Sequence, residues 1–233
     1  MPLRAVLFDV DFTIAKPGPD LGPEGYRRLG RRFGLELDPD RYGEARAHAV
    51  TTLERHPELD HDEEVWVLFT EQIIRGMGGN SGRAYECARE MTRAWEHAHN
   101  FQIFEDVLPT LAELRTHALK LGLVSNTGRD LQAFVKHHEL DVDAAVSSGT
   151  HGKTKPHPTI FEAALERLEV EAAVAVMVGD SIEDDVEGAK AVGMRGLLLD
   201  RENRYPEVEE KLTDLRELPA ALGLAGPASQ LNT

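Results

Sequence analysis

The segment LRAVLFDVDFT, residues 3–13, passes from an apolar run directly into two carboxylates, Asp9 and Asp11. A short apolar run that contains Val and Phe is typical of a parallel strand buried on both faces. Side chains two residues apart in an extended segment point to the same side, so both carboxylates can face one site. We therefore expect a buried strand over residues 3–8 whose carboxyl end opens into a polar site.

Downstream of Phe101, predicted strands alternate with predicted helices. The strands are expected at residues 119–124, 144–146, 173–178 and 196–199. The helices are expected at residues 107–114, 131–135, 160–168 and 184–192. Strands that alternate with helices in this way require right-handed crossovers, which build a mostly parallel, doubly wound α/β sheet.

The stretch between these two parts, residues 17–100, is rich in Arg, Glu, Ala and His and has no convincing strand. Helices are expected over residues 22–34, 40–55, 61–76 and 81–98, with Pro or Gly in the loops between them. The sequence therefore predicts a core of residues 1–16 and 101–233, with a helical insert of residues 17–100. Because the insert follows the first strand, we expect it above the carboxyl ends of the strands, where such sheets bind ligands.

The composition excludes several classes of function. The formal net charge of −15 disfavours binding to nucleic acid or to an anionic membrane, because both would repel the chain. No apolar stretch approaches the length of about 20 residues that spans a bilayer, and no signal-peptide cleavage pattern is present. Cys87 is the single cysteine and is expected to be a small buried residue of a helix. We expect a cytoplasmic protein, either a monomer or a homodimer.

Two of the segments that follow predicted strands carry groups that can bind an anion. Ser125 and Asn126 end one strand and precede a glycine and a new helix, so their side chains and the backbone can donate to an anion. Lys155 precedes Pro156, which restricts its backbone and would aim its ammonium group into the cleft. Taken singly, the first segment also fits an ordinary turn, and the second fits a solvated lysine.

Acidic residues gather at two other strand ends. Asp9 and Asp11 are close enough for their like charges to drive their proton affinities apart, which leaves one ionised and the other able to hold a proton. Asp180, Asp184 and Asp185 follow the strand at 173–178, and helix capping explains only one of them. A divalent cation explains the cluster, and Mg²⁺ is favoured over Zn²⁺ because no Cys/His ligand set accompanies the acids.

The order of these four segments resembles the haloacid dehalogenase superfamily of phosphohydrolases. That family carries Asp-x-Asp-x-Thr, then a Ser or Thr at a strand end, then a Lys often followed by Pro, then Gly-Asp with further acids. The matching residues in this chain, in the same order, are Asp9-Val10-Asp11-Phe12-Thr13, Ser125, Lys155-Pro156 and Gly179-Asp180-Ser181 with Asp184 and Asp185. The resemblance implies a Rossmann-like core, and the insert looks like the α-helical cap of the family's phosphoglycolate phosphatase-like group.

The resemblance also implies a reaction and a role for each residue. The implied enzyme is a Mg²⁺-dependent phosphatase of a small phosphate ester, such as a sugar phosphate, phosphoglycolate or a nucleotide. The implied nucleophile, which forms an aspartyl-phosphate, is Asp9, and the implied acid/base is Asp11. Mg²⁺ would be held by Asp9, the backbone carbonyl of Asp11, and Asp180. The other implied residues are Ser125, Asn126 and Lys155 at the phosphoryl group, and Asp184 and Asp185 in support of the metal or of Lys155.

One position departs from the family pattern, and two other functions compete with the phosphatase. Phe12 stands where the family usually has Gly, so substrate preference is less predictable than family membership. A 2-haloacid dehalogenase of the same fold uses an Asp nucleophile without metal, but it typically lacks the acid at Asp11. A non-catalytic binding domain would be signalled by loss of Asp9, Lys155 or Asp180, and all three are present.

In the insert, the candidates to face the site are Arg46, His56 and the loop 76–82.

Overall fold

The core is one parallel sheet of six strands in the order β5-β4-β1-β6-β7-β8, in a computed structural model that describes residues 2–224. Of the core range expected from the sequence, residues 1 and 225–233 lie outside the described residues. All neighbouring strands pair in parallel, so the predicted doubly wound α/β fold is confirmed. The strands are β1 (Ala5–Phe8), β4 (Lys120–Ser125), β5 (Ala144–Ser147), β6 (Ala175–Gly179), β7 (Arg195–Leu199) and β8 (Lys211–Leu212).

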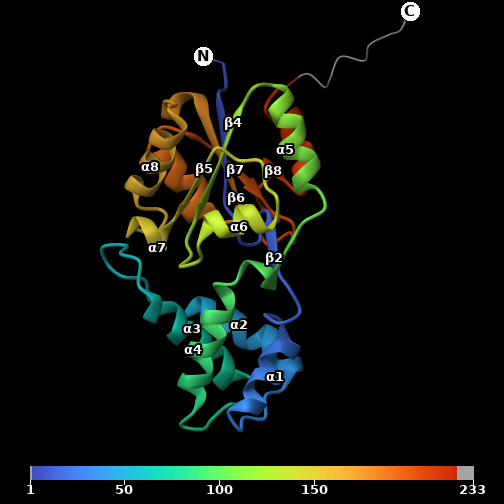
Figure 1. The fold of residues 1–233 in the computed structure, drawn as a ribbon, viewed down its shortest axis with the longest axis vertical. Coiled ribbons are helices and arrows are strands. Elements are labelled where there is room, and N and C mark those ends of the chain that lie inside the picture. The colour runs from blue at the N-terminus through green and yellow to red at the C-terminus, as the bar shows by residue number, and fades with distance from the viewer. Residues whose placement is uncertain (1, 225–233) are drawn as a thin grey trace, which may run out of the picture.

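Helices cover both faces of this sheet, with α8 on one side and α5 on the other (Figure 1). Strand β1 shows why two layers are needed, because all four of its side chains are buried. Val6 and Phe8 pack in the same apolar cluster as Leu111 of α5, whereas Leu7 packs with Phe161 of α8. The helices of the core are α5 (Val107–Thr116), α6 (Leu131–His137), α7 (Ser148–His151), α8 (Pro158–Leu168), α9 (Gly188–Ala191) and α10 (Leu218–Ala221).

Four helices between residues 18 and 100 form a separate layer, here called the helical lobe, below the sheet in Figure 1. Each lies within one of the four segments expected from the sequence. Cys87 is buried in the lobe, as predicted, at 1% exposure. The lobe helices are α1 (Pro23–Arg32), α2 (Tyr42–Thr51), α3 (Glu63–Gly76) and α4 (Ala84–Trp95).

The chain enters and leaves the lobe through a small antiparallel ribbon that the sequence patterns did not predict. Strand β2 (Ala15–Pro17) pairs with β3 (Phe101–Ile103), so Lys16 lies opposite Gln102. At three residues each, these strands are too short to show a recognisable alternation of apolar and polar residues. The ribbon brings both connections between lobe and core to one place.

The loop between α2 and α3 contacts the core at a second place. The backbone N–H of His61 donates to the carbonyl of Gly152 at 2.9 Å, and the N–H of Thr154 donates to the carbonyl of Leu59 at 2.8 Å. Lys153 adds an ion pair with Asp60 at 2.6 Å. The lobe therefore contacts the core at this loop as well as at the β2–β3 ribbon.

Short helical turns complete the fold. The segment after β6 is a π-helix rather than the start of the expected α-helix at 184–192, and π-helical turns are frequent at functional sites. Among residues 2–224, no helix combines the length and the apolar character that crossing a bilayer demands. The turns are η1 (Pro39–Arg41), η2 (Ala98–Asn100), η3 (Ala172–Val174), η4 (Ile182–Glu187) and η5 (Leu215–Glu217).

Candidate active site

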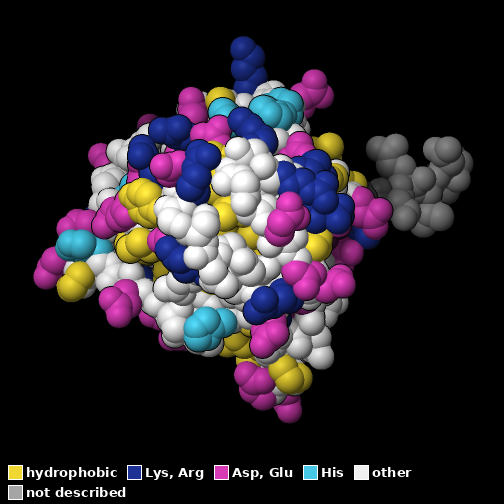
Figure 2. Space-filling view, turned by 90° about the horizontal axis from the view of Figure 1, so that it is seen from below, with side chains coloured by type: hydrophobic (Ala, Val, Ile, Leu, Met, Phe, Trp, Pro, Cys, Tyr) yellow, Lys and Arg dark blue, Asp and Glu magenta, His cyan; other side chains and the backbone are white. Residues whose placement is uncertain are grey.

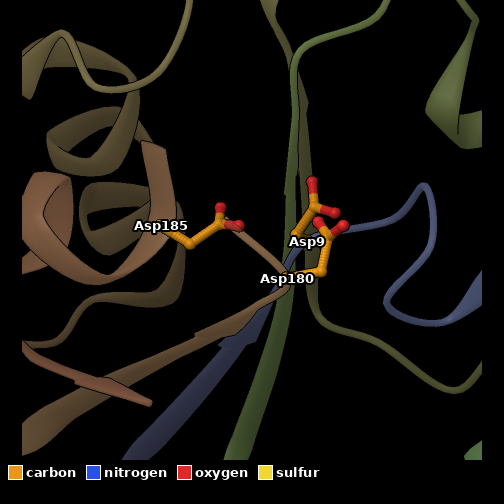
Figure 3. Close-up of side chains that lie close together, drawn as sticks. All are labelled: Asp9, Asp180 and Asp185. Atoms are coloured by element: carbon orange, nitrogen blue, oxygen red, sulfur yellow. The ribbon is translucent and has the colours of Figure 1, made fainter. Parts of the chain in front are cut away.

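Three carboxylates meet where β1 and β6 end. These strands are neighbours in register, with Phe8 opposite Val178, so Asp9 and Asp180 leave the same edge of the sheet. Asp185 approaches from the first turn of η4, and Figure 3 shows the three side chains close together. One oxygen atom from each of the three carboxylates lies within 4.8 Å of the other two. The sheet therefore gathers the acids that the sequence placed after two different strands.

Lys155 lies among these acids and is almost fully buried. Its Nζ is 2.6 Å from Asp9 Oδ1 and 2.6 Å from Asp185 Oδ1. Burial acts to lower the pKa of Lys155, but the two carboxylates outweigh it and raise the pKa above its usual value. Lys155 therefore carries a permanent positive charge beside Asp9.

Asn126 holds the backbone of Lys155 in place. The Asn126 side chain accepts from the Lys155 N–H at 2.6 Å and donates to the Lys155 carbonyl at 3.0 Å. The loop after β4 therefore positions the ammonium group that the loop after α7 supplies. The predicted contacts of Asn126 and of the buried Ser125 with a phosphoryl group stay predictions.

The charge at this edge of the sheet suits a divalent cation. Burial, together with the charge of Asp9, raises the pKa of Asp180 to about 6, and burial raises that of Asp185 to about 7 against the opposing charge of Lys155. The three carboxylates contact two cations, Lys155 and Arg204, so the cluster still carries excess negative charge. Closely grouped carboxylate oxygens are the ligands that Mg²⁺ prefers. The donor set therefore fits the metal expected from the sequence.

Gly179 allows the carboxylate of Asp185 to approach Lys155 and Asp9. A Cβ at this position would lie 2.1 Å from the carboxylate of Asp185. Any other residue would push Asp185 away from Lys155 and from Asp9.

Asp11 lines the same cavity as Asp9 but pairs with Arg129, a residue that the sequence did not single out. Arg129 Nη1 and Nη2 each lie 3.1 Å from Asp11 Oδ1. Burial and the charge of Asp9 raise the pKa of Asp11, whereas Arg129 opposes the rise. That the backbone carbonyl of Asp11 binds the metal stays a prediction.

The remaining acids and bases form pairs around the cluster. Asp184 accepts from Arg55 of the lobe instead of joining the three carboxylates, with Arg55 Nη2 at 3.0 Å. Asp180 accepts from Arg204 Nη2 at 2.6 Å. Asp184 thus links the core to the lobe, and Arg204 balances part of the charge of Asp180.

A cavity of about 280 Å³ opens above the carboxylates, between the core and the lobe. Asp9, Ser125 and Lys155 line its floor. Of the lobe positions expected to face the site, Arg46 lines this cavity, whereas His56 lines a smaller cavity beside it. Within the described part of the chain, the loop 76–82 lines neither.

Comparison with known proteins identifies the family. The family model of haloacid dehalogenase-like hydrolases matches residues 3–193. The chain belongs to this family. The predicted resemblance and the prediction of a hydrolase are confirmed.

Relatives of this haloacid dehalogenase-like hydrolase include phosphatases. It is 35% identical over 244 residues to a phosphoserine phosphatase of Thermus thermophilus. This match covers 92% of this chain and 95% of the relative. It is 29% identical to a haloacid dehalogenase-like hydrolase domain-containing protein 3 of Bos taurus, over 94% of this chain and 91% of the relative. A phosphatase structure from Thermococcus onnurineus matches with 31% identity and a TM-score of 0.65, over 97% of this chain and 100% of the other.

A solved 2-haloacid dehalogenase is also similar. The enzyme from Pseudomonas syringae is 25% identical with a TM-score of 0.62, over 95% of this chain and 98% of the other. Both of the enzyme classes that competed on the sequence therefore share this fold. The site, and not the fold, has to distinguish between them.

Phe12 is the position at which this hydrolase departs from the family pattern. Its φ is +67°, a left-handed conformation that glycine adopts freely and that a bulky residue adopts at a cost. The Phe12 ring lies 5.0 Å from the guanidinium of Arg46 and lines the cavity. The backbone therefore keeps the shape that the usual glycine favours, and the extra ring becomes part of the cavity wall.

Proposed function

We propose that this hydrolase removes phosphate from a small phosphate monoester, such as a sugar phosphate, phosphoglycolate or a nucleotide, in a Mg²⁺-dependent reaction through an aspartyl-phosphate on Asp9. The observation that carries the proposal is the position of Asp9, which lies on the cavity floor against Lys155 and beside Asp180 and Asp185. The related phosphatases support the same reaction class. The acid at Asp11 and the carboxylate cluster favour it over dehalogenation.

Asp9 is the nucleophile in this proposal. Its carboxylate oxygen attacks phosphorus, the P–O bond to the alcohol breaks, and a covalent intermediate divides one difficult step into two. Lys155, 2.6 Å away, offsets the negative charge that accumulates when an anion attacks a phosphate dianion. Asp9, Asp180, Asp185 and the backbone carbonyl of Asp11 would hold Mg²⁺, which when bound supplies further positive charge at the phosphoryl group.

Asp11 moves the protons. It gives a proton to the leaving alkoxide in the first step and takes a proton from the attacking water in the second, which releases phosphate and restores Asp9. The raised pKa of Asp11 suits a carboxyl group that holds a proton at the start of this cycle. Arg129 stabilises the ionised form that Asp11 adopts after the first step.

We further propose that residues 17–100 act as a cap domain over residues 1–16 and 101–233. The β2–β3 ribbon and the pair between Arg55 and Asp184 connect the lobe to the core on two sides of the cavity. A lobe that closes over the cavity excludes water from the attack on phosphorus and contacts the organic part of the substrate.

Removal of the metal tests the proposal. We expect the protein to release phosphate from p-nitrophenyl phosphate with Mg²⁺, to lose this activity in EDTA, and to regain it when Mg²⁺ is added back. The physical reason is that the repulsion between Asp9 and the phosphate dianion is then opposed by Lys155 alone. Activity that persists in EDTA would overturn the metal-dependent mechanism. Chloride release from 2-chloropropionate would point to the dehalogenase instead.

Mg²⁺ affinity is expected to rise with pH. The pKa values of about 6 for Asp180 and about 7 for Asp185 mean that protons compete with the metal for these carboxylates. The Mg²⁺ affinity is therefore at its maximum above pH 7 and falls as the pH drops through 7 and 6. The fall is up to about tenfold per pH unit for each proton that the metal displaces. Titration calorimetry in two buffers of different ionisation enthalpy measures both the affinity and the released protons. An affinity that is flat across this range would contradict the expectation.

A further inference from the structure

The lobe wall of the cavity is aromatic. Trp66 and Phe69 of α3, Tyr42 of α2, and Trp95 at the end of α4 all line the cavity above the acids. Trp66 and Phe69 meet edge to face, with their ring centroids 6.1 Å apart and their planes at 82°. This geometry is a favourable one for aromatic pairs, and it makes the two rings one continuous apolar surface.

These rings are open to the cavity and are not simply core of the lobe. Ile73 and Ile74 of the same helix are fully buried, whereas Trp66 and Phe69 keep part of their surface exposed. The far end of the lobe has a different character, because Figure 2 shows acidic and basic side chains intermixed there, with hydrophobic side chains only in scattered places. The partly exposed surface of Trp66 and Phe69 therefore belongs to the cavity that both residues line.

The charged residues of the same wall disfavour an anionic organic group. Glu63 and Glu96 line the cavity from the lobe, and Arg46 is the one Lys or Arg that the lobe contributes to its described lining. The Arg46 guanidinium lies over the ring of Phe12, which directly follows Asp11 in the first motif. On this wall a carboxylate or second phosphate of the substrate would thus meet two acids and one arginine, while Arg129 on the core side is already paired with Asp11.

We propose that the preferred substrate is a phosphate monoester of an uncharged, apolar alcohol whose flat ring packs against Trp66 and Phe69. This inference rests on the proposed phosphatase function, keeps its reaction, and replaces the examples of substrate named there. The cavity of about 280 Å³ lies just below the usual range for ligand pockets, roughly 300–1,000 Å³, and suits one phosphoryl group and a single ring system. Trp66 and Phe69 are then specificity-determining residues, and sugar phosphates and phosphoglycolate are poorer substrates.

Three esters with similar leaving groups test the proposal with the full chain and Mg²⁺. Benzyl phosphate, glycerol 3-phosphate and phosphoglycolate all release a primary alkoxide, so their kcat/KM values compare the organic groups and not their intrinsic reactivity. We expect benzyl phosphate to exceed both others by roughly ten- to a hundredfold, the effect of burying one ring. If phosphoglycolate or glycerol 3-phosphate is preferred, the inference is wrong and the phosphatase function stands. If no ester is hydrolysed, the proposed function falls with it.

Two variants locate the preference. Trp66→Ala and Phe69→Ala are each expected to lower kcat/KM for benzyl phosphate about tenfold, mainly through KM, and to change glycerol 3-phosphate less than about twofold. The matched control is Leu68→Ala on the same helix, where the residue is 46% exposed and does not line the cavity. It should leave the ratio of the two substrates unchanged. Equal losses on both substrates in the Trp66 and Phe69 variants would overturn the assignment of these rings to the organic group.

Discussion

Replacement of Asp9 by Asn is expected to lower phosphate release by about a thousandfold or more, because an amide cannot attack phosphorus. The substitution keeps the size of the side chain and removes one of the two carboxylates that contact Lys155. Asp185 still accepts from Lys155 at 2.6 Å, so the buried ammonium keeps a partner. We therefore expect a folded protein whose thermal midpoint in EDTA equals or exceeds that of the parent, because repulsion within the cluster is reduced.

The measurement is phosphate release and thermal unfolding on the same preparations. Asp141→Asn is a matched control, since it also replaces one carboxylate by an amide, but on a side chain that is 75% exposed and pairs with Arg115. It should retain parental activity. An Asp9→Asn protein that folds and keeps more than about a tenth of the activity would show that Asp9 is not the nucleophile.

The sequence predicted which acids lie close together where those acids follow a strand end. Asp9 and Asp180 leave adjacent parallel strands, so the alternation of strands and helices was enough to place them at one edge. Lys155 follows no strand directly. Its place in the cluster depends on the side chain of Asn126, which bonds its backbone from another loop. The family resemblance supplied what the spacing alone left open.

The sequence failed where a contact depends on packing between distant segments. The strands β2 and β3 have three residues each and pair with each other across the whole of residues 18–100. Arg129 lies in the segment Gly128-Arg129-Asp130, which has the composition of a solvated turn. Nothing in that segment indicates that its guanidinium is 1% exposed and reaches Asp11. Single-sequence patterns record local periodicity and not such tertiary pairs.

Arg129 also joins Asp11 to the lobe. Its Nε donates to the carbonyl of Trp95, at the end of α4, at 3.1 Å. Its guanidinium lies 3.6 Å from the ring centroid of Phe101, the first residue of β3. The position of Asp11, the proposed acid/base, is therefore linked through Arg129 to the same segment that connects the lobe to the core. We infer that Arg129 is a positioning residue, which sets both the direction and the proton affinity of Asp11.

Replacement of Arg129 by Met is expected to lower kcat at neutral pH by roughly ten- to a hundredfold and to move the acidic limb of the pH profile upward. Burial and the charge of Asp9 already raise the pKa of Asp11, and Arg129 is the cation that opposes them most strongly. Without it, Asp11 keeps its proton to a higher pH and cannot act as the base in the second step. Activity should recover as the pH rises above the new pKa, so the deficit is largest at low pH.

The shape of the pH profile separates this role from a purely structural one. Arg115→Met is the control, because Arg115 also forms ion pairs with carboxylates, those of Asp141 and Asp143, but does not line the cavity. It is expected to lower thermal stability without moving the profile. Arg129→Lys restores the positive charge but cannot contact Asp11 through two nitrogen atoms. Its pH profile should therefore return part of the way toward the parental profile. If the Arg129→Met profile falls uniformly at every pH, Arg129 supports the fold and does not set the proton affinity of Asp11.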